Sequence, residues 1–279
     1  MNSQRTALKD MVPFPVKHRL RRTVNAFVSF PRDQASCAIK SPGRLQRQYQ
    51  AWYWRRHLQR FFEQLVRPGD LVFDIGAHVG LWTLGLERVG CRVIAVEPQG
   101  ACADKIASRS GERVTIVHSA VGSAAGEAEL FLSANTEMAS LAPGWMKTMI
   151  ERAGVPAEAW SESVIVPVRT LDDLVDEFGV PEYIKLDVEG SEAQALSGLG
   201  QPVNVISFEA HGQTVDYSSA VVGRLLELDR YEFNLSPGEF PKLLWPDWRD
   251  ERRLLRALKD EPTGWHNVFA RRVDSPARA

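Results

Sequence analysis

Short apolar runs alternate with amphipathic segments from residue 71 to residue 273 of this chain. Each apolar run has the length of a buried strand, and each amphipathic segment has the apolar spacing of a helix. Glycine and proline turns separate the two kinds of segment. Repeated strand–helix units of this kind predict a doubly wound α/β fold with a mainly parallel sheet.

The chain has 279 residues, enough for one α/β domain and an appendage. Residues 68–279 carry the strand–helix pattern and form the expected domain. Residues 1–67 carry 14 Lys and Arg against 3 acids, a balance of +11, whereas residues 68–279 carry a balance of −12. We expect residues 1–67 to form a basic helical extension that packs on the domain, because their aromatic side chains recur at near-helical spacing. Such an arm is also suited to an anionic partner or a membrane surface.

Two parts of the expected domain depart from simple alternation. The apolar run 114–121 predicts a third strand, and residues 127–133 predict a short strand that follows a glycine turn and pairs with it as a hairpin. Residues 134–163 are the least regular stretch. A segment of this length without clear secondary structure is typical of a lid or a substrate-side insertion.

The first of two loop motifs follows the strand predicted at residues 71–74. It reads Asp74-Ile75-Gly76-Ala77-His78-Val79-Gly80, and its glycines let backbone amides approach a ligand closely. A dinucleotide-binding loop has glycine where this chain has Asp74. A carboxylate there repels a pyrophosphate and attracts an ammonium group.

Glu97 ends the next predicted strand, residues 92–97. An acid at this position accepts hydrogen bonds from ribose hydroxyls. A ligand with a ribose, a cationic amino acid end and no phosphate matches S-adenosylmethionine. Its adenine is expected beside the end of the third strand, near Ser119 and Ala120. The structural alternative is that Asp74 and Glu97 only cap the sheet.

The second motif reads Ile184-Lys185-Leu186-Asp187-Val188-Glu189-Gly190-Ser191-Glu192. Asp187 and Glu189 alternate along a strand end, so we expect their side chains to diverge, one toward the ligand and one toward the neighbouring helix. Two acids this close also shift each other's pKa values apart, which is one way to obtain a base whose pKa is near neutral pH. Lys185 is expected to pair with a nearby acid such as Glu209.

His211 follows the next predicted strand and is the best histidine candidate for a general base. The alternative is a solvated loop residue. Asp187, Glu189, Glu209 and His211 are residue types that suit Mg²⁺ or Mn²⁺, but their spacing is not diagnostic. A divalent metal is therefore considered and not predicted.

Several stretches of the sequence together match the pattern of a known family. The stretch Val168-Arg169-Thr170-Leu171-Asp172-Asp173-Leu174, the second motif, Leu196-Ser197-Gly198 and Ile206-Ser207-Phe208-Glu209 together resemble the FkbM family of S-adenosylmethionine-dependent methyltransferases. The resemblance covers roughly residues 70–235. It implies a seven-stranded Rossmann-like class I methyltransferase fold and O-methylation of a hydroxyl on a sugar or natural product.

The resemblance also implies roles for individual residues. It gives Asp74, Gly76 and Glu97 to the cofactor and puts Asp187, Glu189 and Glu192 on the wall opposite the sulfonium. The expected catalytic residues are Asp187, Glu189 and His211. The expected cofactor-binding residues are Asp74, Gly76, Ala77, His78, Gly80, Glu97, Pro98, Ser119, Ala120 and Asp187.

Two other functions stay open from the sequence alone: a nicotinamide-dependent oxidoreductase, and a non-catalytic module that binds a nucleotide or, through the basic arm, nucleic acid. The three cysteines (Cys37, Cys91 and Cys102) have no metal-ligand spacing and predict a cytoplasmic protein without disulfides. No apolar run reaches the ~20 residues of a membrane span, and we expect no signal peptide. The expected partner is a small-molecule or glycan acceptor rather than a nucleic acid.

Overall fold

The computed structural model describes residues 57–133, 135–238, 241–262 and 264–273. Residues 1–56, with Cys37 and most of the predicted basic extension, lie outside the described residues. The division of the chain at residues 67 and 68 therefore stays a prediction. Residues 57–62 are helical, and Leu58, Phe61 and Phe62 are buried in a core of the domain.

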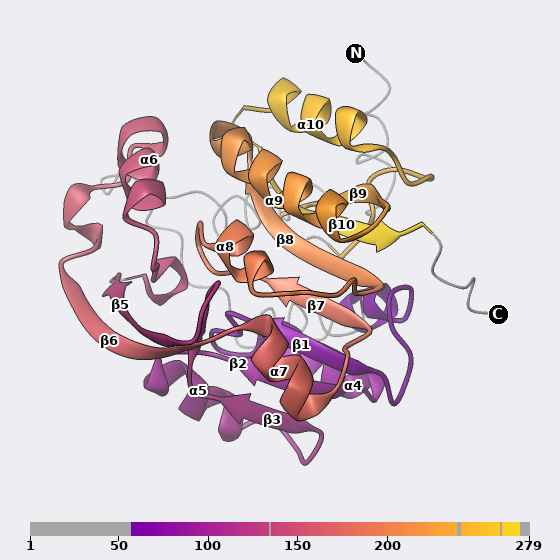
Figure 1. The fold of residues 1–279 in the computed structure, drawn as a ribbon, viewed down its shortest axis with the longest axis horizontal. Helices are drawn as coiled ribbons and strands as arrows, with labels where there is room; N and C mark the ends of the chain where they lie inside the picture. Colours follow the sequence, from indigo (N-terminus) through magenta and orange to yellow (C-terminus); the bar gives the residue numbers. More distant parts are fainter. Residues whose placement is uncertain (1–56, 134, 239–240, 263, 274–279) are drawn as a thin grey trace, which may run out of the picture. The chain divides into compact units, whose positions relative to one another are not determined.

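Seven strands form the central sheet in the order β3-β2-β1-β7-β8-β10-β9 (Figure 1). The first five strands in that order are parallel, and β10 runs antiparallel to both β8 and β9. Their bounds are β1 Leu71–Ile75, β2 Arg92–Val96, β3 Val114–Val117, β7 Tyr183–Leu186, β8 Val205–His211, β9 Tyr231–Pro237 and β10 Trp265–Arg272. The doubly wound, mainly parallel, seven-stranded sheet is confirmed.

The strand order reverses between β1 and β7. From β1 the chain runs outward through β2 to β3, and it returns to the other side of β1 as β7. In open parallel sheets, ligands bind beside the carboxyl ends of the strands at such a reversal. The first motif follows β1 and the second follows β7, so the topology brings both to this point.

Helices cover both faces of the sheet (Figure 1). The helices α7 (Leu171–Phe178), α8 (Glu192–Ser197), α9 (Val215–Leu228) and α10 (Glu251–Asp260) pack on one face, in a core with Phe73, Ile184 and Ile206. The helix α4 (Leu81–Val89) packs on the opposite face with Val72 and Tyr183. Successive strand residues thus point to opposite faces, as a sheet buried on both sides requires. The helix α5 (Gly100–Ala107) follows β2.

Local signals account for several element ends. Thr170 accepts a hydrogen bond from the backbone N–H of Asp173, whose side chain in turn accepts from the N–H of Thr170. This capping box starts α7 at the predicted position. The helix α10 was not predicted, and β8 reaches His211 instead of ending before it.

The predicted strand 114–121 and its hairpin are corrected by the structure. The run splits into β3 and the two-residue strand β4 (Ala120–Val121), which belongs to a second sheet of order β4-β6-β5. There β5 (Gly126–Leu132) pairs antiparallel with β6 (Glu162–Arg169), and β4 pairs parallel with β6. Because β4 offers only two residues, a seven-residue strand finds its partner elsewhere, beyond the insertion.

The expected insertion, residues 134–163, is more regular than its sequence predicts. It contains two short 3₁₀ turns, η1 (Thr136–Met138) and η2 (Ala157–Ala159), and the helix α6 (Pro143–Ala153). Met138, Trp145, Met149 and Val155 form a small core of its own. Its role as a lid or substrate-side element stays a prediction.

Within the described ranges, no helix is both long and apolar enough to cross a membrane. Cys91 and Cys102 are buried free thiols.

Candidate active site

The loop after β1 lies directly against the second motif. The N–H groups of Gly76 and Ala77 donate to the carbonyl oxygen of Val96, at 2.9 and 3.1 Å. Gly76 has φ of 76°, and a Cβ atom placed on it would lie 1.8 Å from the carbonyl oxygen of Asp187. Only glycine fits this conformation and this close approach. The loop ends at Gly80, which precedes α4.

Glu97 fixes the other side of the same loop. Its carboxylate accepts hydrogen bonds from the backbone N–H groups of His78 and Gln99, both at 2.8 Å. It is only 2% exposed, and a carboxylate still has acceptor capacity after two such bonds. Pro98, between these contacts, is half-buried. The arrangement suits an acid that also accepts a ribose hydroxyl.

Two further predicted cofactor residues lie at the end of β3. Ser119 is buried, and its hydroxyl has no hydrogen-bond partner among the described residues. Ala120, also buried, begins β4. Since buried polar groups are normally paired, the unsatisfied hydroxyl of Ser119 fits a site that a polar ligand such as adenine completes.

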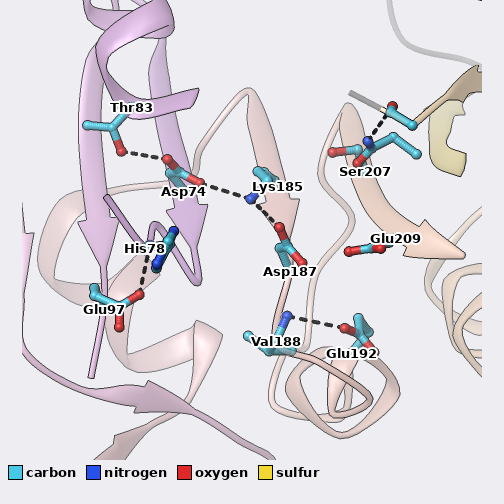
Figure 2. A network of polar contacts seen from close by, with 12 residues as sticks. Asp74, His78, Thr83, Glu97, Lys185, Asp187, Val188, Glu192, Ser207 and Glu209 are labelled. Atoms are coloured by element: carbon cyan, nitrogen blue, oxygen red, sulfur yellow. Dashed lines mark hydrogen bonds and ion pairs between the residues drawn. The ribbon is translucent and has the colours of Figure 1, made fainter. Parts of the chain in front are cut away.

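A chain of polar contacts links the two motifs (Figure 2). Thr83 donates to one oxygen of Asp74 at 2.5 Å, and Lys185 Nζ lies 3.8 Å from the other oxygen. Lys185 also donates to Asp187 Oδ2 at 2.7 Å. The sequence predicts that Lys185 pairs with a nearby acid such as Glu209; in the structure Lys185 pairs with Asp187 and Asp74.

Asp187 and Glu189 converge instead of diverging. One carboxylate oxygen from each, together with one from Glu209, lies within 4.8 Å of the others. The prediction was wrong because β7 ends at Leu186, before the motif's acids, so strand alternation does not apply to them. Glu189 has φ of 51°, which turns the chain back toward the sheet.

The insertion holds this turn in place. Ser140 donates to the carbonyl oxygen of Glu189 at 2.6 Å. Trp145 packs on Gly190, where a Cβ atom would lie 2.2 Å from the indole ring. At the first motif, Nε2 of His78 lies 2.7 Å from Oγ1 of Thr136. Residues from the insertion therefore contact both motifs.

Two of the convergent acids, Glu189 and Glu209, line a small pocket. His211 ends β8 at its rim, with Nε2 2.9 Å from Oε1 of Glu209. The lining residues are Trp145, Glu189, Gly190, Glu192, Glu209, His211, Thr214, Tyr217, Ser218 and Val221. Neither Lys nor Arg occurs among these described lining residues.

The chain is similar to several known proteins. The crystal structure of a precorrin-6y C5,15-methyltransferase from Geobacter metallireducens matches with a TM-score of 0.42 and 11% identity, over 78% of this chain and 86% of that one. An S-adenosylmethionine-dependent O-methyltransferase from Thermotoga maritima matches with a TM-score of 0.38 and 16% identity, over 80% of this chain and 67% of that one. The model of the methyltransferase FkbM domain matches residues 74–235. The chain belongs to the FkbM methyltransferase family.

A curated relative agrees with this assignment. The chain is 30% identical over 160 residues to 31-O-demethyl-FK506 methyltransferase FkbM from Streptomyces tacrolimicus. The match covers 48% of this chain and 61% of the relative. The family resemblance is confirmed.

The acids of this FkbM-family site have unequal proton affinities. Burial raises the pKa of Glu209 to about 7 despite its contact with His211. Burial, together with the nearby charges of Glu209 and Asp187, raises the pKa of Glu189 well above its usual value. Burial also acts on Asp187, but the ammonium of Lys185 outweighs it and lowers the pKa of Asp187. The cluster therefore holds one firmly ionised acid and two that retain protons more tightly.

Two neighbouring groups complete the electrostatics. Burial lowers the proton affinity of His211, but contact with Glu209 and the surrounding acids outweigh it, so the pKa of His211 is raised. Burial raises the pKa of Glu192 to about 6, although the N–H groups of Val188 and Gly190 donate to its carboxylate. The three converging carboxylates (Asp187, Glu189 and Glu209) are close enough to share a proton or a divalent cation.

Some residues of the FkbM-family site were missed from the sequence. Thr136, Ser140 and Trp145 lie in the expected insertion, residues 134–163, and nothing in their spacing marks them. The role of Lys185 carried a signal, since a lysine within an apolar strand needs a buried counter-charge. That signal did not identify which acids supply it.

Proposed function

We propose that this FkbM-family chain is an S-adenosylmethionine-dependent methyltransferase, rather than an oxidoreductase or a non-catalytic module, and that it acts on a hydroxyl oxygen of a sugar or another hydroxyl-bearing natural product. The observation that carries the proposal is the Glu209–His211 pair, a proton acceptor of near-neutral pKa that lines a pocket together with Glu189 and Gly190 of the second motif. An alcohol must lose its proton to accept a methyl group, and a base is most effective when its pKa is near the working pH. The similar protein from Streptomyces tacrolimicus is named 31-O-demethyl-FK506 methyltransferase FkbM, and this name supports a hydroxyl oxygen as the acceptor.

The described residues fit S-adenosylmethionine. In this proposal, Glu97 accepts a hydrogen bond from the ribose. Ser119, whose hydroxyl is unsatisfied, and Ala120 border the adenine, and Asp187 faces the cationic amino acid end of the cofactor. The remaining proposed cofactor contacts are Asp74, Gly76, Ala77, His78, Gly80 and Pro98. When bound, S-adenosylmethionine supplies an electrophilic methyl group on a sulfonium.

The protein's own contribution is to orient the acceptor and take its proton. In the proposed mechanism, Glu189 accepts a hydrogen bond from the acceptor, and His211 removes the hydroxyl proton through Nδ1, the ring nitrogen that does not face Glu209. Glu209, at 2.9 Å from Nε2 of the same ring, stabilises the imidazolium that forms. Trp145 and Tyr217 give the pocket aromatic surface, which favours a largely apolar or sugar-ring acceptor.

The acceptor atom is tested with methyl-labelled S-adenosylmethionine and a panel of hydroxyl-bearing sugars and macrolides. We expect the label to be transferred to oxygen, which nuclear magnetic resonance of the product identifies. Transfer to nitrogen or carbon instead would contradict the proposed acceptor class while leaving the family assignment intact.

Replacing Glu97 by glutamine is expected to weaken S-adenosylhomocysteine binding about tenfold, because one charge-assisted hydrogen bond to the ribose is weakened. Glutamine also brings an amide N–H₂ toward the backbone N–H groups of His78 and Gln99. Isothermal titration calorimetry measures the change. The matched control is Glu87→Gln, on α4 away from the motifs; equal affinities of the Glu97 variant and wild type would remove Glu97 from the cofactor site.

A further inference from the structure

Lys185 joins two carboxylates that differ in their access to a ligand. Its Nζ lies 2.7 Å from Oδ2 of Asp187 and 3.8 Å from Oδ1 of Asp74. The Asp74 side chain is 0% exposed, whereas the Asp187 side chain is 27% exposed. Of the two acids, Asp187 is the one that a bound molecule can reach.

Neighbouring groups hold Lys185 next to Asp74. The register of β1 and β7 sets Asp74 opposite Lys185, and Thr83 holds the second oxygen of Asp74. The ammonium of Lys185 lies 5.4 Å from the centre of the Trp82 ring, a favourable cation–π distance. A buried ammonium needs such partners, since a lone charge is costly to desolvate.

The backbone of Asp187 is joined to the cofactor loop. Its N–H donates to the carbonyl oxygen of Ile75 at 3.0 Å, and Gly76 packs on its carbonyl group. The carboxylate of Asp187 lies beside Lys185, as Figure 2 shows, and the Asp187 backbone borders the loop after β1.

We propose that Lys185 is a positioning residue that links Asp74 to Asp187 and holds the Asp187 carboxylate toward the cationic amino acid end of the cofactor. Asp74 then acts through Lys185. The sequence predicts that Asp74 attracts the cofactor ammonium, and in this proposal Asp187 attracts it instead. The inference rests on the proposed function, since its ligand is S-adenosylmethionine.

Two probes separate this role from a general structural one. S-adenosylhomocysteine carries the amino acid end, whereas 5′-methylthioadenosine shares its adenosine part and lacks that end. Titration calorimetry with both probes is applied to wild type, Lys185→Met, Lys185→Arg and Asp74→Asn. Thermal unfolding of each variant is measured alongside.

We expect Lys185→Met to weaken S-adenosylhomocysteine binding at least about tenfold and to change 5′-methylthioadenosine binding less than about twofold. Lys185→Arg keeps the positive charge and is expected to recover part of the loss. Asp74→Asn is expected to cost a smaller factor, about threefold, because Lys185 keeps its closer partner Asp187.

Three outcomes overturn the proposal: equal weakening of both probes by Lys185→Met, unchanged S-adenosylhomocysteine binding in that variant, or a larger loss in Asp74→Asn than in Lys185→Met. If Lys185→Met does not fold, the variant carrying both Asp74→Asn and Lys185→Met removes one charge of each sign and is compared in the same way. Wild type that binds 5′-methylthioadenosine but not S-adenosylhomocysteine also overturns the proposal. Wild type that binds neither probe contradicts the proposed function itself.

Discussion

Replacing Glu209 by glutamine is expected to slow methyl transfer at least about 100-fold and to stabilise the folded protein above pH 7. The activity falls because glutamine cannot stabilise the imidazolium of His211 as the proton leaves the acceptor. The variant keeps the size of the side chain, so the pocket retains its shape. The rate is measured with the acceptor that the labelled-methyl panel identifies.

The stability change has a definite pH dependence. Burial raises the pKa of Glu209 from 4.5 to about 7, so the folded protein binds this proton more tightly than the unfolded chain does. Stability therefore falls as the pH rises from about 4.5 and stops falling once the pH has passed about 7. The shift corresponds to about 3 kcal/mol of folding stability that the wild type loses over this pH range. Glutamine has no ionisable proton, so the variant does not lose this stability.

Thermal unfolding at pH 5 and pH 8 measures this effect. We expect Glu209→Gln to unfold at a higher temperature than wild type at pH 8 and at nearly the same temperature at pH 5. The control is Glu227→Gln on α9, whose exposed side chain pairs with Arg224 and should have little effect at either pH. A gain in stability that is the same at both pH values, or an unchanged rate, would contradict the assignment.

The second large effect is expected from Gly76→Ala. A methyl group there would meet the carbonyl oxygen of Asp187 at 1.8 Å, and φ of 76° strains any residue with a Cβ atom. The loop must shift away from the second motif to accommodate it. We expect S-adenosylhomocysteine affinity to fall more than about 100-fold and the free energy of unfolding to fall by about 2 kcal/mol or more.

Gly223→Ala is the matched control for this prediction. Gly223 lies within α9, and a Cβ atom placed there has no neighbour within 4 Å. Alanine favours a helix over glycine by about 1 kcal/mol, so this variant should be slightly more stable and bind the cofactor as wild type does. Wild-type affinity in Gly76→Ala would show that the loop does not form the cofactor site.

Much of the fold and the position of the site follow from local signals in the sequence. The apolar runs before Asp74 and Asp187 predict β1 and β7, and the acid and glycine turns after them predict two loops at one edge of the sheet. Thr170 predicts the start of α7. These features depend on residues near one another in the chain, where period and turn chemistry are informative.

The remaining features depend on contacts between distant segments. The pairing of β5 with β6 spans the insertion, and no local pattern reports it. Asp187 and Glu189 converge because β7 stops one residue before the motif's first acid and Glu189 adopts a left-handed backbone. The contacts of Ser140 and Trp145 with the second motif likewise depend on how the insertion folds back.

The most direct test of the central claim is a calorimetric titration of the whole chain with S-adenosylhomocysteine and, separately, with NAD. The loop after β1, with Asp74 in place of a glycine and Glu97 at the end of β2, predicts one site per chain for S-adenosylhomocysteine, with a dissociation constant of about 1–100 μM, and no binding of NAD. No heat of binding with S-adenosylhomocysteine at about 1 mM, or tighter binding of NAD, would contradict the account.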